Sequence, residues 1–387
     1  MPPAIVAPSL ALSAYYFVYF AYVGAYSPYF TLYLRDLGLA AAQIGVLYAI
    51  PQVMRIFGPA AWGALADRSG APVVIVRVAA LLSAACFALL YAGGSFAWIF
   101  AVLVAMHFFT SAQMPVVEAV TLNHVRDRPG MYGRIRVWGS IGFIAAVLAL
   151  GALLDRVPTT AVLHATAAML ALSAVAAFLI PARTGRAPAG PRGGLAAILG
   201  QRRVRAFLAA CLLNGFAHAA LYAFYSIHLA ARGYTTTAIG ILWAAGVLIE
   251  IAVFQAMPQL LRRHDPSVLF ASTFGVCAVR FLIIGWGVGS WWLLLAAQLM
   301  HAATFAIYHA SAVALVGRYF GSEHQARGQG LYASLSFGAG GFAGGIVSGL
   351  AWDALGAGWT FTISAVAGAL GLALLTAGGQ PGVAGSR

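Results

Sequence analysis

The chain has 387 residues, of which 62% are hydrophobic and only 8% are charged. A soluble globular protein carries about a quarter charged residues, so this composition excludes a soluble protein and predicts one integral to a membrane. A net charge of +13 would indicate nucleic-acid binding in a soluble chain. Here the basic residues lie mainly in short loops between apolar segments, which excludes that class and indicates the cytoplasmic face of a membrane.

Twelve apolar segments each approach the roughly 20 residues that a spanning helix needs. The first is long and aromatic and lacks the short apolar core and cleavage site of a signal peptide, so we expect it to be retained. All basic residues are arginine, which with the abundance of Ala and Gly indicates a bacterial source. The predicted spanning helices are 10–34, 43–65, 71–92, 96–123, 132–153, 159–180, 204–231, 237–261, 267–287, 290–317, 327–352 and 357–378.

A basic segment rich in Pro and Gly, PARTGRAPAGPRGGLAAILGQRRVR at 181–205, separates the sixth predicted helix from the seventh. Such composition is typical of a linker on the protein surface. We therefore predict an all-α membrane protein with two pseudo-symmetric six-helix bundles, 1–180 and 204–387, joined by a basic linker at 181–203.

The arginines predict the topology, because cytoplasmic loops are enriched in basic residues. The odd-numbered connections between predicted helices hold only Arg35, Arg156 and Arg232. We therefore expect both termini and the linker to be cytoplasmic, in a bacterial inner membrane. The even-numbered connections hold Arg68, Arg126, Arg128, Arg183, Arg186, Arg192, Arg202, Arg203, Arg205, Arg262, Arg263, Arg318 and Arg327.

The two halves resemble each other, since LRDLGLAAAQIGVLYA (34–49) aligns without a gap with LAARGYTTTAIGILWA (229–244). Both segments lead into the second helix of their half. Extending the alignment places Arg55 opposite Glu250, which is either coincidence or a functional pair of positions. The cost of a charge at that depth favours function. The matched pairs are Gly38 with Gly233, Ile44 with Ile239, Gly45 with Gly240 and Leu47 with Leu242.

Two parallel six-helix repeats resemble the major facilitator superfamily, in which the substrate site lies between the halves near mid-membrane. GALADRSG (63–70), at the end of the second predicted helix, is similar to the superfamily's loop signature Gly-x-x-x-Asp-Arg/Lys-x-Gly. The resemblance implies a glycine that allows close helix packing and an aspartate that accepts bonds from helix ends and loop arginines in one conformational state. The gating residues implied are Gly63, Asp67, Arg68 and Gly70.

The motif is incomplete in both halves. The basic pair that usually follows it is replaced by Ala71-Pro72, and the second-half counterpart is reduced to QLLRRHDP (259–266).

A closer resemblance is to the lactose permease-like branch, in which an acid of the fourth helix pairs with an arginine of the fifth. PVVEAV supplies Glu118 and GRIRVWG supplies Arg136, at the spacing of that branch. AVRFLIIG and LMHAATFAIYHA are similar to its ninth- and tenth-helix segments, and they supply Arg280 and His301. Three short segments are together most similar to the 3-phenylpropionate permease group: EIAVF after AAG, FYSIHL, and HAATF.

The chain departs from that branch at Thr304, where lactose permease has a proton-coupling glutamate three residues after the histidine. The acid of the eighth helix also lies a turn later, as Glu250. Glu250 is therefore our first candidate for the proton carrier, with Arg136 within conceivable reach across the half interface. The alternative is a gating pair of Glu250 with Arg280 or Arg55.

Glu118 and Arg136 admit two interpretations, a salt bridge that only fixes two helices and a site for substrate or proton. Ions at membrane depth cost at least a few kcal/mol each, and an apolar pair would hold helices more cheaply, so we favour the site. Arg280 and Arg55 could each hold a substrate carboxylate by bidentate bonds. Arg55 could equally serve gating.

Histidines and aromatic residues provide further candidates. His301 and His309 are eight residues apart, which places them roughly on one helical face. His218 precedes an aromatic cluster that contains Tyr222. A lone His in an apolar helix is usually a packing residue, but these three together indicate a cavity, and histidine can relay protons. Tyr19 is a candidate cavity residue of the first helix, and no metal-ligand spacing is present.

GAGGFA (338–343) matches a dinucleotide fingerprint, but it lies inside a long apolar helix without the required strand, turn and helix. We therefore predict that its glycines serve close helix packing.

The sequence predicts a secondary transporter that works by alternating access, most simply a monomeric proton symporter of a small organic carboxylate that the resemblance implies to be phenylpropionate-like. No GxxxxGK[ST] motif occurs, so we expect neither ATP nor any other cofactor, and no nucleic acid. A sugar or nucleoside symporter and a drug or metabolite efflux antiporter are the alternatives within transport. An enzyme should show a clustered nucleophile and base, and a receptor a long polar domain; neither is evident.

Overall fold

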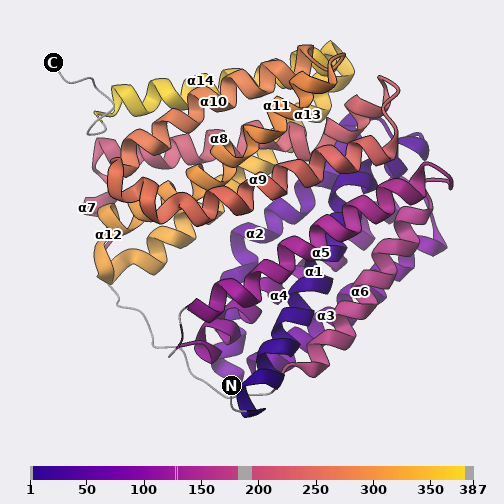
Figure 1. The fold of residues 1–387 in the computed structure, drawn as a ribbon, viewed down its shortest axis with the longest axis horizontal. Helices are drawn as coiled ribbons and strands as arrows, with labels where there is room; N and C mark the ends of the chain where they lie inside the picture. The colour runs from indigo at the N-terminus through magenta and orange to yellow at the C-terminus, as the bar shows by residue number, and fades with distance from the viewer. Residues whose placement is uncertain (1–2, 127, 129, 182–193, 380–387) are drawn as a thin grey trace. The chain divides into compact units, whose positions relative to one another are not determined.

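The protein is nearly all helical (Figure 1), as seen in a computed structural model that describes residues 3–126, 128, 130–181 and 194–379. The predicted linker lies mostly outside the described residues. In order the elements are α1 (Pro3–Asp36), α2 (Ala41–Ser69), α3 (Pro72–Ala88), the 3-10 turn η1 (Leu89–Ala92), α4 (Phe96–His124), α5 (Gly130–Leu154), α6 (Ala161–Leu179), α7 (Ala196–Leu199), α8 (Arg202–Ala230), α9 (Thr236–Arg263), α10 (Pro266–Trp286), α11 (Trp291–Leu299), the π-helix η2 (Ala303–Ile307), α12 (Tyr308–Ala333), the π-helix η3 (Ser334–Gly340), α13 (Gly341–Leu355) and α14 (Ala357–Ala377).

The predicted fold class is confirmed. Among the described residues, 10 helical stretches are long and apolar enough to cross a membrane. One of them, Trp291–Leu355, spans 65 residues and contains both predicted segments 290–317 and 327–352, with a break at Gly321 (φ 62) between them. The first predicted segment corresponds to α1, so each of the twelve predicted segments has a helical counterpart.

Local signals set the helix boundaries. Pro72 and Pro266 occupy first helical positions, where a missing N–H costs nothing. The Ser95 hydroxyl accepts a bond from the Trp98 amide and so caps α4. Gly38 and Gly233, the first matched pair of the internal repeat, both have φ of 82° immediately before α2 and α9. Because L side chains rarely adopt that conformation, the repeat is confirmed in the backbone.

The helices form two compact units. Unit 1 comprises Met1–Leu39, Phe57–Pro188 and Tyr234–Ala244, and unit 2 comprises Ala40–Ile56, Ala189–Gly233 and Ala245–Arg387. The first part of α2 therefore belongs to unit 2, and the first part of α9 belongs to unit 1. Contacts made by the first residues of these two helices therefore fall within single units.

In unit 1, α1 packs along α5 and α6, and α3 packs against α4 and α6 (Figure 1). Glycine permits the closest of these approaches, since a Cβ at Gly142 would overlap the carbonyl of Phe17 and one at Gly24 would overlap Phe143. Buried apolar residues of these helices, such as Tyr15 and Ile135, form the core of the unit.

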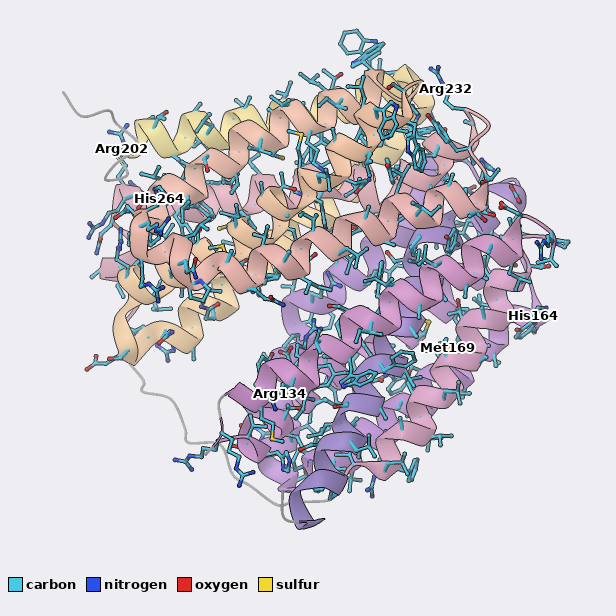
Figure 2. The ribbon with its side chains drawn as sticks, viewed as in Figure 1. Arg134, His164, Met169, Arg202, Arg232 and His264 are labelled. Atoms are coloured by element: carbon cyan, nitrogen blue, oxygen red, sulfur yellow. The ribbon has the colours of Figure 1, made fainter. Side chains whose placement is uncertain are left out.

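In unit 2, α8 packs against α13, α14 and η3, and α10 packs against α12 and α14. The GAGGFA glycines serve close packing, as predicted. A Cβ at Gly340, or at Gly344 just after the motif, would overlap the α8 backbone, and one at Gly338 would overlap the Ile56 side chain of α2. Its aromatic core includes Phe207, Phe270 and Tyr308. Figure 2 shows Arg202 and His264 at one end of this unit and Arg232 at the other, which agrees with the predicted loop assignment.

The contact between α8 and η3 yields a stability prediction. A Cβ at Gly215 would overlap the Ser336 backbone, so Gly215→Ala should destabilise the protein by about 1–3 kcal/mol. Gly330 of α12 has no atom within 4 Å of such a Cβ, so Gly330→Ala should stabilise by about 0.5–1 kcal/mol. Thermal unfolding in detergent measures both, and equal shifts for the two variants would contradict the packing argument.

Candidate functional site

Arg280 is a fully buried charge on α10, with an exposed fraction of 0%. Its Nε donates to the carbonyl oxygen of Ala297 at 2.8 Å, and its Nη1 donates to Oγ1 of Thr304 at 2.9 Å. Within the described part of the chain, Nη2 has no hydrogen-bond partner and no carboxylate lies within 4.0 Å of the guanidinium. Because an unpaired buried charge costs several kcal/mol, this geometry suits an anion from outside the chain.

Thr304 and His218 hold the guanidinium in place. Thr304 lies on η2, and single π-helical turns are frequent at functional sites. His218 Nδ1 is 2.8 Å from the Asn214 carbonyl oxygen, which can only accept, so Nδ1 carries the hydrogen. Nε2 of the neutral ring then accepts, 3.2 Å from Thr304 Oγ1 and 3.4 Å from Arg280 Nη1.

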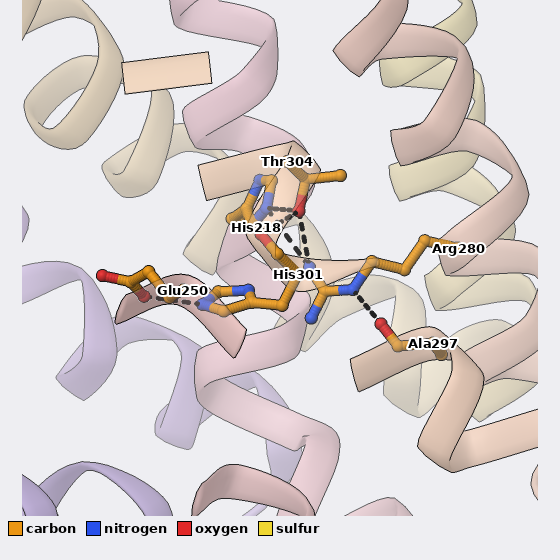
Figure 3. A network of polar contacts seen from close by, with 6 residues as sticks. All are labelled: His218, Glu250, Arg280, Ala297, His301 and Thr304. Carbon is orange, nitrogen blue, oxygen red and sulfur yellow. Dashed lines mark hydrogen bonds and ion pairs between the residues drawn. The ribbon is translucent and has the colours of Figure 1, made fainter. Parts of the chain in front are cut away.

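Glu250 and His301 form the second part of the network. His301 Nε2 lies 3.6 Å from Oε2 of Glu250, whose side chain is 19% exposed, and the two are an ion pair when the imidazole is protonated. Figure 3 shows the His301 ring between the Glu250 carboxylate and the Arg280 guanidinium. His301 Nδ1 is buried and has no hydrogen-bond partner among the described residues. The imidazole therefore has one nitrogen toward the acid and one available to a ligand.

The network divides its chemistry between two kinds of group. An arginine does not lose its proton in proteins, so Arg280 can only fix an anion. The Glu250 carboxylate and the His301 imidazole, by contrast, each have an atom that can bind a proton. A ligand anion and a proton would thus be held within one continuous set of contacts.

Two further predicted residues of unit 2 lie near this network. His309 is separated from His301 by Phe305, and the three rings stack at centroid distances of 5.5 and 6.5 Å, which confirms that the histidines share a face. His309 Nδ1 is 2.8 Å from the hydroxyl of Tyr332. Tyr222 is half-buried on α8.

In unit 1 the expected Glu118–Arg136 pair is not formed, since these two described residues share no ion pair or hydrogen bond. The Arg136 guanidinium instead lies over the Phe20 ring at 4.3 Å and over Tyr16 at 5.6 Å. The aromatic faces of α1 attract the planar cation, and this replaces the carboxylate contact. Tyr19 belongs to the same cluster, 5.6 Å from Phe20 between ring centroids.

The residues assigned to gating lie on or directly after α2. Gly70 has φ of 62°, which explains the glycine, but a Cβ at Gly63 would meet no atom within 4 Å, so the expected close packing is absent there. Asp67 and Arg68 form no hydrogen bond or ion pair with the described residues. Arg55 is exposed and donates to Gln52 Oε1 at 3.1 Å.

In the second-half counterpart of the motif, QLLRRHDP (259–266), the aspartate forms an ion pair. Asp265 accepts from the Ser267 amide at 2.7 Å and from two nitrogens of Arg318, each at 3.1 Å. Burial raises the pKa of the Asp265 carboxyl, but the bonds from Arg318 and Ser267 outweigh this and leave the pKa below its usual value. The bond from the Ser267 amide also makes Asp265 the N-terminal cap of α10.

Sequence reasoning singled out Asn214 as a small polar candidate but missed the supporting residues Ala297 and Gln298. Asn214 and Ala297 act through backbone carbonyls, which carry no sequence signature. Gln298 lies beside His301, since a Cβ at Gly246 would be 3.2 Å from Gln298 Oε1 and 3.5 Å from the imidazole. Gln298, a polar residue about one turn before His301 in an apolar segment, was the one sequence signal that could have indicated this contact.

A model of the MFS_1-like family matches residues 9–363, which is most of the chain. The chain belongs to this family. As a member of the major facilitator superfamily it is a transporter rather than an enzyme, and it is a multi-pass protein of the bacterial inner membrane.

The names of similar proteins describe transporters of different compounds. A "Probable 3-phenylpropionic acid transporter" of Escherichia coli is 29% identical over 329 residues, which cover 84% of this chain and 86% of that protein. A maltose permease of Geobacillus stearothermophilus is 31% identical over 277 residues, which cover 69% and 68%. The crystal structure of the nucleoside transporter NupG has a TM-score of 0.80 at 18% identity, over 96% of this MFS_1-like chain and 98% of that one, and shows the shared fold.

Proposed function

We propose that the protein is a secondary active transporter that moves a small organic carboxylate together with protons by alternating access. The observation that carries this proposal is Arg280, buried completely and without a carboxylate partner among the described residues. A bound carboxylate would accept from Nη2 and neutralise the charge. A sugar or a nucleoside would leave the charge uncompensated.

An aromatic carboxylate is the substrate class that the surroundings favour. The Arg280 guanidinium lies 5.5 Å from the centroid of the Phe281 ring, and His218 meets that ring edge to face at 5.3 Å. Phe361 stacks on Phe281 at 6.4 Å. Aromatic rings beside a cation suit a ligand with a carboxylate and an apolar ring, such as the phenylpropionic acid named for one relative.

The Glu250–His301 pair is the proposed proton carrier. A substrate anion near this pair and a proton on it attract each other, so each increases the affinity for the other by the same factor. This reciprocity is the thermodynamic requirement for symport. His301 would take part in both events, since its Nδ1 is available to the substrate and its Nε2 contacts Glu250.

The remaining organisation is proposed on the same basis. The six-helix halves, 1–180 and 204–387, would rock about a central site as a monomer, with both termini and the linker in the cytoplasm. The proposed gating residues, on or directly after α2, are Gly63, Asp67, Arg68, Gly70 and Arg55. The further proposed residues for binding substrate or protons are Arg136, Glu118 and Tyr19 in the first half of the sequence and Tyr222 and His309 in the second.

Reconstituted protein tests this proposal directly. Proteoliposomes with an imposed inward proton gradient are given 3-phenylpropionate, benzoate, maltose or xanthosine, each radiolabelled, with and without a protonophore. We expect accumulation of the aromatic carboxylates, abolished by the protonophore. Accumulation of maltose or xanthosine alone would establish a sugar or nucleoside symporter instead. Loss of preloaded substrate driven by the gradient would establish an efflux antiporter.

A further inference from the structure

Two helices begin with backbone amides that are bound by an aspartate from a distant part of the chain. Asp155, directly after α5, accepts from the Thr236 amide at 2.7 Å and from the Thr236 and Thr237 hydroxyls at 2.6 and 2.5 Å. Asp353, on α13, accepts from the amides of Ala41 and Ala42 at 3.2 and 2.8 Å. The first set of bonds lies within unit 1 and the second within unit 2.

The two sets of bonds are equivalent in the internal repeat. The alignment that pairs Gly45 with Gly240 also pairs Ala41 with Thr236 and Ala42 with Thr237, without a gap. Each repeat therefore presents the same two amides at the start of its second helix. Each half of the sequence also supplies the aspartate that binds the amides of the other half.

Both helices pass from one unit into the other. The first residues of α9, up to Ala244, belong to unit 1, while Ala245 onward belongs to unit 2; α2 changes from unit 2 to unit 1 after Ile56. Each aspartate thus binds the end of a helix whose remainder belongs to the other unit. Because α2 and α9 are continuous helices, a movement of one sequence half against the other would strain the hydrogen bonds of Asp353 and Asp155 to their first amides.

Helix backbones come close together next to each aspartate. A Cβ at Gly45 would overlap the carbonyl of Gly345 and lie 3.1 Å from the Cα of Gly349. A Cβ at Gly240 would lie 2.6 Å from the Tyr29 hydroxyl and 2.8 Å from the Val147 carbonyl oxygen. The carboxylates add charged hydrogen bonds to these close contacts.

The electrostatics suit a bond that forms and breaks repeatedly. The first amides of a helix lack intrahelical partners and carry a partial positive charge, which a carboxylate satisfies. Burial raises the pKa of the Asp155 carboxyl, but the bonds from Thr236 and Thr237 outweigh this and hold the pKa below its usual 3.8. Both aspartates are exposed, so water can replace the bonds when they break.

We propose that Asp155 and Asp353 are paired gating residues, which hold the first turns of α9 and α2 while their end of the transporter is closed and release them when it opens. By the arginine distribution this end is the periplasmic one. The gate would act independently of the substrate, so it does not depend on which cargo the transporter carries.

Distance measurements by electron spin resonance test the proposal. Spin labels at Thr160→Cys and Leu355→Cys, two exposed positions at the ends of these segments, are read in a functional variant with Cys86, Cys211 and Cys277 replaced. We expect Asp155→Ala and Asp353→Ala each to raise the population of the longer distance by about 3- to 30-fold, and the double variant to raise it further. Asn keeps one acceptor oxygen, so Asp155→Asn should give a smaller increase.

Asp36→Asn is the matched control. Asp36 is also exposed and accepts from the Thr159 hydroxyl at 2.9 Å, but it binds no amide at the start of α2 or α9. The control should leave the distance distribution unchanged. Unchanged distributions in both alanine variants, with normal unfolding temperatures, would overturn the proposal. An equal response to Asp36→Asn would also overturn it, because the effect would then be general surface charge.

Discussion

Carboxylate uptake should fall at least about 100-fold when Arg280 is replaced by lysine, although the positive charge is kept. The guanidinium donates from Nε to Ala297 and from Nη1 to Thr304, which leaves Nη2, unpartnered among the described residues, for the proposed substrate carboxylate. An ammonium group is a point donor on a flexible stem and cannot make both anchoring bonds while binding a carboxylate. Initial rates in proteoliposomes, together with substrate-induced stabilisation against thermal unfolding, measure the two consequences.

Arg318→Lys provides the control for that experiment. Arg318 is an arginine of the same unit that also makes two bonds to one carboxylate, that of Asp265, but it is largely exposed. Its replacement should change uptake little, since exposed ion pairs contribute about 0–1 kcal/mol. An Arg280→Lys protein that unfolds at the normal temperature and retains the normal KM would show that the anion binds elsewhere.

Replacing Glu250 by glutamine should separate transport from proton coupling. The amide keeps the size of the side chain but cannot take up a proton, so the pair with His301 loses its exchangeable charge. For one proton per substrate, a gradient of one pH unit supports about tenfold accumulation. We expect that ratio to fall to about one in Glu250→Gln, while exchange of labelled for unlabelled substrate across the membrane continues.

Glu323→Gln serves as the comparison, because Glu323 is an exposed acid on α12 of the same unit. It should accumulate substrate normally. Continued gradient-driven accumulation in Glu250→Gln would assign the proton to another residue, and loss of exchange as well as accumulation would indicate a role for Glu250 in binding substrate rather than in coupling.

The positions of the helices follow from the hydropathy of the chain and from the residues that end helices. Each of the twelve predicted segments lies in a helix, since long apolar runs in lipid can only be helical. The repeat matched Gly38 with Gly233 in the sequence, and in the structure both residues have the same left-handed backbone. What the segments could not predict is the π-helical turns, because their hydrogen-bond pattern depends on neighbouring helices.

The candidate site was predictable residue by residue but not as a set of partners. Arg280, Glu250 and His301 stand out because each is expensive in a membrane. Their pairing depends on side-chain direction across α9, α10 and η2, which spacing along one chain does not give. The expected Glu118–Arg136 pair shows the same limit: spacing placed the arginine on the right helix, and the aromatic ring of Phe20 took the place of the acid.

Asp155 and Asp353 had no signature at all. An acid near the end of an apolar segment is an ordinary boundary residue. The repeat drew attention to the segments whose amides donate the hydrogen bonds rather than to the aspartates that accept them. Only the fold brings Asp155 to Thr236, 81 positions away along the chain.

The π-helical turn η2 has a consequence for how the site is encoded. A π turn holds one residue more than an α turn, so a single-residue deletion within Ala303–Ile307 would let the segment revert to an α-helix. The flanking residues would keep their faces, because the wide turn absorbs the extra residue. The same segment forced into α-helical geometry at constant length would instead turn His301 by about 100° relative to His309. The shared face of the two histidines thus depends on the wide turn as well as on their spacing along the chain.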